Sequence, residues 1–221
     1  LFAWRQWGVD CLKRLNGMFA FAIYDQRSRQ LFLARDRLGV KPLFYARVSD
    51  GSILFGSELK ALLANPLLRR DPNITAVDDY LAFGYVPDQT SLLKGVKKLA
   101  AGHYLLLEQG KPEPESVQYW DMDFSQRSKG SARDLEEELV ELLKQAVNSR
   151  MISDVPLGAF LSGGVDSSAV VALMAENSRR AVKTCSIGFD QQSLDETGYA
   201  RAIAERFQTD HRERIVASDD F

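Results

Sequence analysis

The sequence predicts a chain of two unlike units, an α+β unit rich in antiparallel strands followed by an α/β unit with a parallel sheet. Three observations support this prediction. Short aromatic-rich runs alternate with polar turns in the first half, a polar segment without apolar periodicity occupies 121–130, and strand and helix patterns alternate after it. We therefore expect one domain in residues 1–120, a linker in 121–130 and a second domain in 131–221.

The composition is typical of a folded globular protein. Of the 221 residues, 45% are hydrophobic and 26% are charged. The net charge of −2 argues against a nucleic-acid partner. The longest apolar runs, 18–23 and 169–175, are much shorter than the ~18 residues of a membrane span, so we expect no membrane segment. We interpret Cys11 and Cys185 as isolated thiols in apolar surroundings, which suggests the reducing cytoplasm.

The first unit is expected to be an antiparallel meander with added helices. Its strands are expected at 18–24, 30–34, 42–45, 52–56 and 103–108, its hairpin turns at 25–29 and 49–51, and its helices at 58–64 and 75–83, the second capped by Thr75. A charged turn between strands, for which we expect internal salt bridges, contains Arg35, Asp36, Lys41 and Pro42. His103 is expected to be a satisfied polar residue at the start of a strand.

The second unit is expected to begin with an amphipathic helix, because Ser131 and Asp134 form a capping signature. Its apolar face is expected to hold Leu135, Leu139, Leu142, Leu143, Ala146 and Val147, with the glutamates of 136–138 in solvent. Further elements are expected as a strand at 157–161, a helix at 166–177, a strand at 183–189, a helix at 195–207 and a strand from His211. Asp195 and Glu196 are expected to be N-terminal acids of the helix at 195–207.

The segment most informative about function runs Leu161-Ser-Gly-Gly-Val-Asp-Ser-Ser168, between an apolar strand and a helix. Its two glycines let the backbone turn sharply, and the free N–H groups that open the helix attract an anion. Ser162, Ser167 and Ser168 add hydroxyl donors, whereas Asp166 would repel a bare phosphate unless a cation such as Mg²⁺ lies between them. The segment therefore predicts a site for a magnesium-bound polyphosphate. It lacks the lysine of a Walker loop, and a simple Gly-Gly turn is the alternative.

These residues resemble the signature loop of the N-type ATP pyrophosphatases, and the stretch 154–162 resembles the corresponding stretch of glutamine-hydrolysing asparagine synthetases. Residues 15–25, 34–43 and 56–61 resemble the later part of the glutaminase domain of the same family, so the resemblance covers nearly the whole chain. It implies part of an amino-terminal-nucleophile (Ntn) glutaminase domain followed by the start of a doubly wound ATP pyrophosphatase domain.

The resemblance also implies ATP and Mg²⁺ as cofactors and assigns roles to individual residues. By resemblance, ATP phosphates bind Ser162, Gly163, Gly164, Ser167 and Ser168, Mg²⁺ binds Asp166, and the adenine lies between Leu161 and Ile187. From spacing alone, the preferred interpretation of Ile187 is a core residue of its strand. The implied substrates are glutamine, aspartate and ATP. The aspartate side chain becomes an acyl-adenylate, and ammonia from glutamine converts it to asparagine, with glutamate, AMP and pyrophosphate as the other products. The resemblance leaves open whether the protein forms a homodimer.

The start of the chain departs from that family. Its glutaminase requires an N-terminal cysteine, because the free α-amine acts as the base for the thiol, whereas this chain begins with Leu1 and Cys11 is expected to be structural. No signal peptide follows Leu1, and 218–220 resemble a helix cap without its helix. We therefore expect a piece of a longer protein that by itself is inactive. Two alternatives remain open: a different carboxylate acceptor, for example one linked to exopolysaccharide, and a nucleotide-binding module without catalysis.

Overall fold

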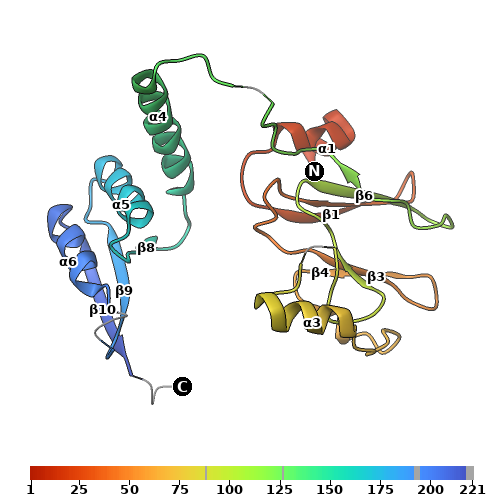
Figure 1. The fold of residues 1–221 in the computed structure, drawn as a ribbon. Helices are drawn as coiled ribbons and strands as arrows, with labels where there is room; N and C mark the ends of the chain where they lie inside the picture. Colours follow the sequence, from red (N-terminus) through yellow and green to blue (C-terminus); the bar gives the residue numbers. More distant parts are fainter. Residues whose placement is uncertain (88, 126, 192–194, 218–221) are drawn as a thin grey trace. The chain divides into compact units, whose positions relative to one another are not determined.

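The structure is a computed structural model that describes residues 1–87, 89–125, 127–191 and 195–217 (Figure 1). It divides into two compact units, Leu1–Ser125 and Gln126–Phe221. The sheets of the first unit are antiparallel and the sheet of the second is parallel, so the chain is a mixed α/β protein as predicted. The helix cap expected at 218–220 lies outside the described residues.

The first unit contains two antiparallel sheets and four helical segments. In chain order its elements are α1 (Phe2–Trp7), the 3₁₀ helix η1 (Gly8–Arg14), β1 (Ala20–Asp25), β2 (Gln30–Arg35), β3 (Phe44–Arg47), β4 (Ile53–Gly56), α2 (Leu59–Leu63), α3 (Ile74–Phe83), β5 (Val96–Lys98), β6 (His103–Glu108) and β7 (Val117–Gln118). Both predicted hairpins are confirmed, since Asp25 pairs with Gln30 and Arg47 pairs with Ile53. The cap predicted at Thr75 is wrong, because α3 begins earlier and its N-cap is Asn73.

The predicted antiparallel meander is wrong, because the strands of the first unit form two separate sheets. One sheet has the order β1-β2-β6-β7 and the other has the order β4-β3-β5, so β2 pairs with the distant β6 rather than with β3. The chain leaves the first sheet at Asp36, whose buried carboxylate accepts hydrogen bonds from the backbone N–H groups of Phe19, Val40 and Lys41 at 2.9–3.2 Å. The predicted salt bridge is therefore wrong for Asp36, which has only backbone partners among the described residues.

Four layers fill the first unit. The two sheets face each other across a core that includes Leu33 of β2, Leu105 of β6 and Tyr45 of β3. Helical segments cover the outer faces: Cys11 and Leu12 pack on Phe32 of β2, and Leu62 of α2 packs near Val96 of β5. Burial raises the pKa of the Cys11 thiol, which agrees with the expected structural role of this cysteine.

The second unit contains a three-stranded parallel sheet of order β10-β9-β8. Its elements are α4 (Ala132–Arg150), β8 (Gly158–Phe160), α5 (Val165–Asn177), β9 (Lys183–Phe189), α6 (Thr197–Arg206) and β10 (Asp210–Val216). Two right-handed crossovers place α5 and α6 on the same face, where Val171 and Ala200 share one core cluster with Leu161 (Figure 1). Helices on both faces, as a doubly wound sheet requires, are not present within the described residues.

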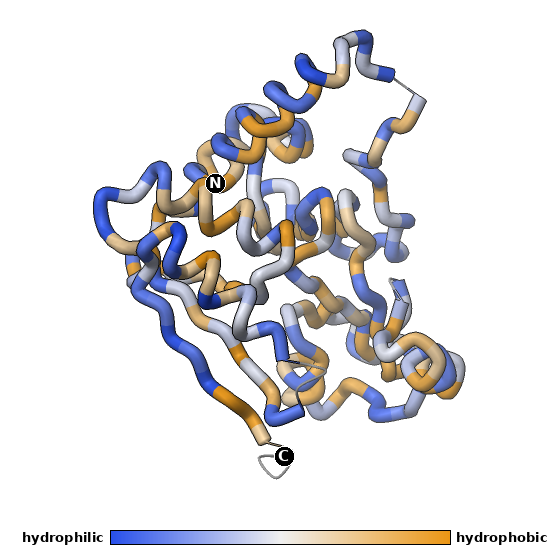
Figure 2. Tube along the Cα trace, turned by 60° about the vertical axis from the view of Figure 1, so that its left-hand side comes forward, coloured by the Kyte–Doolittle hydropathy of each residue, from blue (hydrophilic) through white to orange (hydrophobic). Residues whose placement is uncertain are grey.

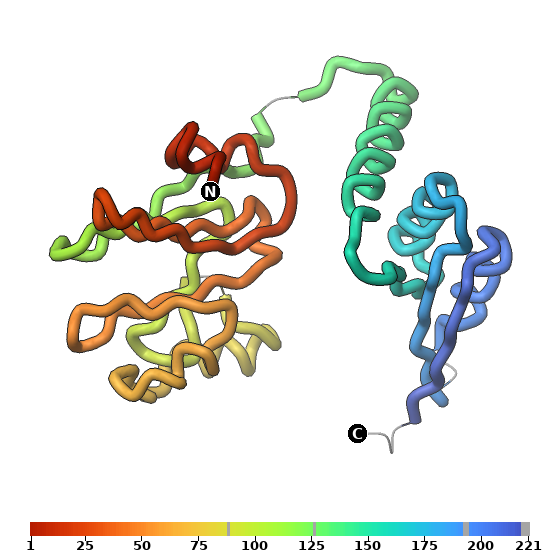
Figure 3. Tube along the Cα trace, turned by 180° about the vertical axis from the view of Figure 1, so that it is seen from behind, coloured from red at the N-terminus to blue at the C-terminus, as the bar shows by residue number. Residues whose placement is uncertain are grey.

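The opposite face of this sheet is open. Along β9, Thr184, Ser186 and Gly188 are buried beneath the helices, whereas the alternate residues Cys185 and Ile187 are exposed. The apolar surroundings predicted for Cys185 are therefore wrong, because its side chain points to the face that the described helices leave uncovered. Figure 3 shows the same unit from behind, with the strands in front of the helices.

Helix α4 is amphipathic but contributes little to the core. Its predicted capping box is confirmed, with the Ser131 hydroxyl accepting from the Asp134 N–H and the Asp134 carboxylate accepting from the Ser131 N–H. The structure describes all of α4, and none of its residues is buried. The predicted apolar face exists, as Figure 2 shows, and α4 packs against α5. The described residues leave the rest of this face exposed. Within the described residues, no helix combines the length and the apolar character that crossing a membrane requires.

Candidate functional site

The candidate site lies at the carboxyl end of β8, where the chain turns into α5. Leu161 fixes the start of this turn: its side chain is 1% exposed and its N–H donates to the Cys185 carbonyl oxygen at 2.9 Å. The turn from Ser162 to Gly164 is therefore held at the edge of the parallel sheet. Ligands of open α/β sheets bind at this edge.

The two glycines of the turn have different roles. Gly163 has φ +82°, and a Cβ placed there would lie 2.7 Å from the Ala200 backbone nitrogen and closer still to the Tyr199 Cβ. Gly164, the N-cap of α5, has φ −68°, and a Cβ there would meet only the Ser162 Oγ at 3.4 Å. Only Gly163 is thus required by the fold, because no other residue fits both its conformation and its contact with α6.

The hydroxyl groups of Ser162 and Ser167 form hydrogen bonds within the loop. The Ser162 and Ser167 Oγ atoms lie 3.1 Å apart, the Ser162 N–H donates to the Ser167 Oγ at 3.3 Å, and the Ser167 Oγ donates to the Gly164 carbonyl at 3.2 Å. These bonds are long, since hydroxyl hydrogen bonds are usually about 2.7–2.8 Å. Anionic oxygen atoms would form shorter bonds with the same donors.

The first turns of α5 supply the remaining predicted residues. Asp166 is exposed and forms no hydrogen bond or ion pair with any residue that the structure describes. The Ser168 Oγ is buried and likewise lacks a hydrogen-bond partner. Free N–H groups at the helix N-terminus, one unpaired carboxylate and one unsatisfied hydroxyl fit a magnesium-bound phosphate group, which Mg²⁺ typically binds through one or two carboxylates and phosphate oxygens.

A cavity of about 310 Å³ adjoins the loop. It brings together four of the predicted residues from the β8–α5 turn, α5 and β9: Leu161, Ser162, Ser167 and Ile187. The other four predicted residues, Gly163, Gly164, Asp166 and Ser168, lie in the adjacent turn and helix start but do not line this cavity. The predicted adenine position between Leu161 and Ile187 and the phosphate position over α5 are thus neighbouring parts of one region. Their roles in binding ATP remain predictions.

Helix α6 provides a wall of the cavity that sequence reasoning missed. Glu196, Thr197 and Ala200 line it, and Thr197 is 2% exposed. Asp195 accepts hydrogen bonds from both the N–H and the Oγ1 of Thr197, at 3.2 and 2.9 Å, so its predicted role as a helix N-terminal acid is confirmed. No local sequence pattern indicates this wall, because the cavity joins α6 to a turn far away in the sequence.

The other histidine and carboxylate candidates form no metal site. His211 of β10 shares hydrogen bonds with the Thr184 Oγ1 at 2.9 Å and the Ser186 Oγ at 3.2 Å, so both ring nitrogens have partners. In the first unit, the His103 Nδ1 lies 2.7 Å from the Ala101 carbonyl oxygen, as expected of a satisfied polar residue. No cluster of three or more potential metal ligands occurs among the described residues.

The first unit has a separate cavity of about 600 Å³ near the start of the chain. Its wall includes Cys11, Asn16, Gly17 and Met18, together with Phe21 of β1. None of the site residues predicted from the sequence lies in this wall. The cavity is largely apolar, with the Asn16 amide as its polar side chain.

Comparisons with known proteins match both units. The family model described as "Glutamine amidotransferase domain" matches residues 1–120, and the family model described as "Asparagine synthase" matches residues 138–221. Between these matches lies 121–137, which includes the polar segment predicted to be a linker.

Curated relatives match nearly the whole chain. A putative asparagine synthetase [glutamine-hydrolyzing] 2 of Methanocaldococcus jannaschii is 41% identical over 97% of this chain and 42% of its own length. Asparagine synthetase [glutamine-hydrolyzing] 3 of Bacillus subtilis is 34% identical over 100% of this chain and 38% of its own length. Amidase chyE of Penicillium rubens is 32% identical over 91% of this chain and 32% of its own length.

The chain thus spans less than half the length of these curated relatives. It has in sequence order the two domains whose families it matches, with the Ser-Gly-Gly loop at the edge of the second sheet. Because the first of these family models covers more than half of the chain, the chain belongs to the glutamine amidotransferase domain family, and its second unit matches the asparagine synthase family model.

Proposed function

We propose that the second unit binds ATP with Mg²⁺ at the 161–168 loop, as part of an enzyme that forms an amide from a carboxylate and glutamine-derived ammonia. In this proposal ATP adenylates the aspartate side chain, releasing pyrophosphate. Ammonia then attacks the acyl-adenylate to give asparagine and AMP, while hydrolysis of glutamine gives glutamate. The proposal assigns the second unit to the ATP pyrophosphatase fold and the first to the Ntn glutaminase fold, with domains at 1–120 and 131–221 and a linker at 121–130.

One observation carries the proposal. The Ser-Gly-Gly turn lies at the carboxyl edge of a parallel sheet, the Ser162 and Ser167 hydroxyl groups form only long hydrogen bonds, and Asp166 at the helix start has no partner among the described residues. Ser162, Ser167, Ser168 and the N–H groups of Gly163 and Gly164 would bind phosphate oxygens. Asp166 would bind the Mg²⁺ that neutralises them. Leu161 and Ile187 would contact the adenine at the 310 Å³ cavity. The proposal places the reaction in the cytoplasm and leaves a homodimer open.

A second candidate concerns the acceptor. Two relatives are named amidases, chry2 of Gibberella zeae and chyE of Penicillium rubens, at 30% and 32% identity. Their names indicate that this architecture is not restricted to proteins named asparagine synthetase. An acceptor carboxylate other than aspartate, with the same ATP chemistry, is therefore the alternative function. An assay of pyrophosphate release by the full-length protein would separate the two functions, because only an asparagine synthetase releases pyrophosphate in an aspartate-dependent manner.

The ATP site itself is tested by Asp166→Ala. Titration calorimetry of ATP with Mg²⁺ into the 221-residue chain should show binding that the variant weakens about tenfold or more, since one charge-assisted contact is lost. Without Mg²⁺ the difference should vanish or reverse, because the carboxylate then only repels phosphate. Asp154→Asn, an exposed acid outside the loop, is the matched control. Equal Mg²⁺-dependent affinity in the wild type and Asp166→Ala would remove Asp166 from the site.

A further inference from the structure

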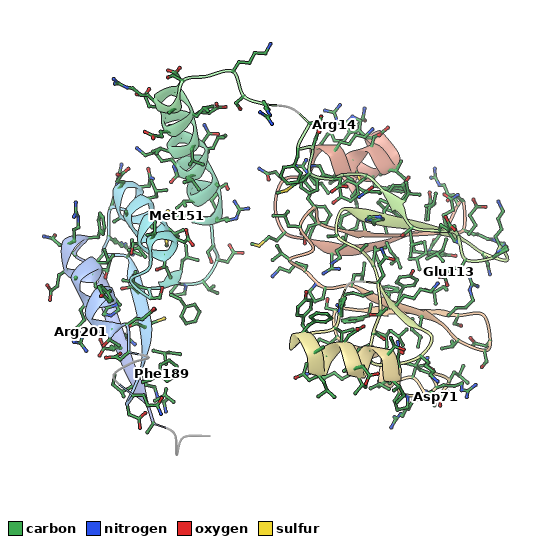
Figure 4. The ribbon with its side chains drawn as sticks, viewed as in Figure 1. Arg14, Asp71, Glu113, Met151, Phe189 and Arg201 are labelled. Atoms are coloured by element: carbon green, nitrogen blue, oxygen red, sulfur yellow. The ribbon has the colours of Figure 1, made fainter. Side chains whose placement is uncertain are left out.

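A chain of polar contacts links the start of α6 to strand β10. Arg201 of α6 donates from Nε and Nη2 to the two carboxylate oxygens of Glu213, both at 2.8 Å, and Nη2 also donates to the Thr197 Oγ1 at 3.0 Å. Thr197 in turn donates to the Asp195 Oδ2 at 2.9 Å. We call Asp195, Thr197, Arg201 and Glu213 the α6 clamp. Figure 4 labels Arg201 on this helix.

The Thr197 end of the clamp is buried against the sheet. Thr197 is 2% exposed, and a Cβ placed on Gly188 of β9 would lie 2.5 Å from the Thr197 Cγ2 and 2.9 Å from the Asp195 Oδ1. The glycine therefore lets both residues approach the strand closely. Although Arg201 and Glu213 are partly exposed, their contact is bidentate, which is the geometry in which a surface ion pair holds a defined position.

The helix that the clamp holds is in contact with the candidate ATP loop. Gly163 packs against Tyr199 and Ala200, which lie between Thr197 and Arg201 on α6. Thr197 and Ala200 also line the cavity that contains Leu161 and Ile187. A small displacement of the first turns of α6 would therefore change the loop and the cavity together.

We propose that Arg201 and Glu213 are positioning residues for nucleotide binding: they hold the first turns of α6 against Gly163 and so fix the shape of the 161–168 loop. This inference rests on the proposed ATP site. It assigns no contact with the ligand to either residue. Arg201 acts through Thr197, and Glu213 acts by orienting the guanidinium group that reaches Thr197.

Two variants separate positioning from simple stabilisation. Glu213→Gln removes the charge that orients Arg201 while nearly keeping the side-chain volume. The double variant R201E/E213R restores an ion pair between α6 and β10. The side chain at position 201 is then a carboxylate, which has no N–H group to donate to the Thr197 Oγ1. Glu137→Gln is the control, since Glu137 pairs with Arg133 at 3.0 Å on the exposed helix α4, away from the loop.

Two readouts on the 221-residue chain complete the test. Glu213→Gln and the double variant should weaken Mg²⁺–ATP binding about tenfold, even though the double variant regains the thermal midpoint of the wild type. Amide hydrogen exchange without nucleotide should be faster in 162–168 in both variants, and unchanged in Glu137→Gln. The proposal would be overturned if, in both variants, the exchange rate of this loop and the affinity for Mg²⁺–ATP were the same as in the wild type.

The exchange readout distinguishes this proposal from the proposed function. If the wild-type chain does not bind ATP but Glu213→Gln still loosens the loop, the clamp positions the loop as inferred and the ATP assignment is wrong. If ATP binds and the double variant recovers both affinity and exchange with its ion pair, the clamp only stabilises the fold and the positioning role is wrong.

Discussion

The two units bury their strands in opposite ways. In the first unit, two antiparallel sheets face each other and helical segments cover the outer faces. Strand β2 is therefore buried on both faces, with its Leu33 in the core between the sheets and its Phe32 in the core beneath the helical segments. In the second unit, the described helices cover one face of the sheet, and Phe160 and Ile187 remain exposed on the other. The first unit therefore places a buried charged group, Asp36, at the turn where the chain leaves one sheet, whereas the second places the hydroxyl groups of its Ser-Gly-Gly loop at a sheet edge.

The largest expected effect is in the first unit. Asp36→Ala removes the acceptor of three backbone N–H groups in a buried turn and should destabilise this unit by about 3–5 kcal/mol. All three tryptophans, Trp4, Trp7 and Trp120, lie in the first unit, so their fluorescence reports its unfolding by denaturant. Asp25→Ala should lower stability by less than about 1 kcal/mol, since its donors are exposed turn N–H groups. Similar losses for both variants would contradict this account.

The next effect is in the second unit and depends on which glycine is changed. Gly163→Ala should destabilise the unit by about 2–4 kcal/mol, because its positive φ and its contact with α6 both exclude a side chain. Gly164→Ala should stay within about 1 kcal/mol of wild type. Helical circular dichroism measures this difference, since the long helix α4 and helices α5 and α6 belong to the second unit. A Gly163→Ala chain as stable as Gly164→Ala would show that α6 does not confine the loop.

A smaller effect on the stability of the second unit should depend on pH. Arg201 lowers the pKa of Glu213 below its ordinary value of 4.5, with His211 adding to the shift and Asp195 opposing it. A carboxylate with a depressed pKa stabilises the folded state above the pKa of the unfolded chain, and this contribution is lost as pH falls through the folded value. The stability difference between wild type and Glu213→Gln should thus be present at pH 7 and shrink below pH 4.5. A difference that is constant from pH 7 to pH 3 would contradict the ion pair.

The smallest effect is expected on the exposed helix. Leu139→Ala on α4 should change the stability of the second unit by only about 0.5 kcal/mol, because this side chain is 56% exposed. The matched change Leu33→Ala, in the core between the two sheets, should cost about 3 kcal/mol. Chemical denaturation of the two variants would sharpen the comparison. A large loss at Leu139 would mean that the apolar face of α4 is covered in solution.

Local patterns in the sequence predicted most of the elements. The strands at 30–34 and 183–189, the capping box at Ser131 and the helix after the Ser-Gly-Gly loop depend on residues close to one another, and all are confirmed. The meander was predicted wrongly because pairing between β2 and β6 joins segments about 70 residues apart, which no local pattern encodes. Cys185 was misplaced because strand alternation does not say which face the helices cover.

Local sequence is sufficient for the family resemblance and for the loop chemistry, because serine hydroxyls, adjacent glycines and an aspartate at the start of a helix specify their donors and acceptors locally. The tertiary structure alone decided that Gly163 must be glycine while Gly164 need not be, and that α6 forms a wall of the cavity. Both depend on contacts between segments far apart in the chain. Such contacts are set by how the parallel strands align and how the helices pack across them, and a linear pattern carries no record of that packing.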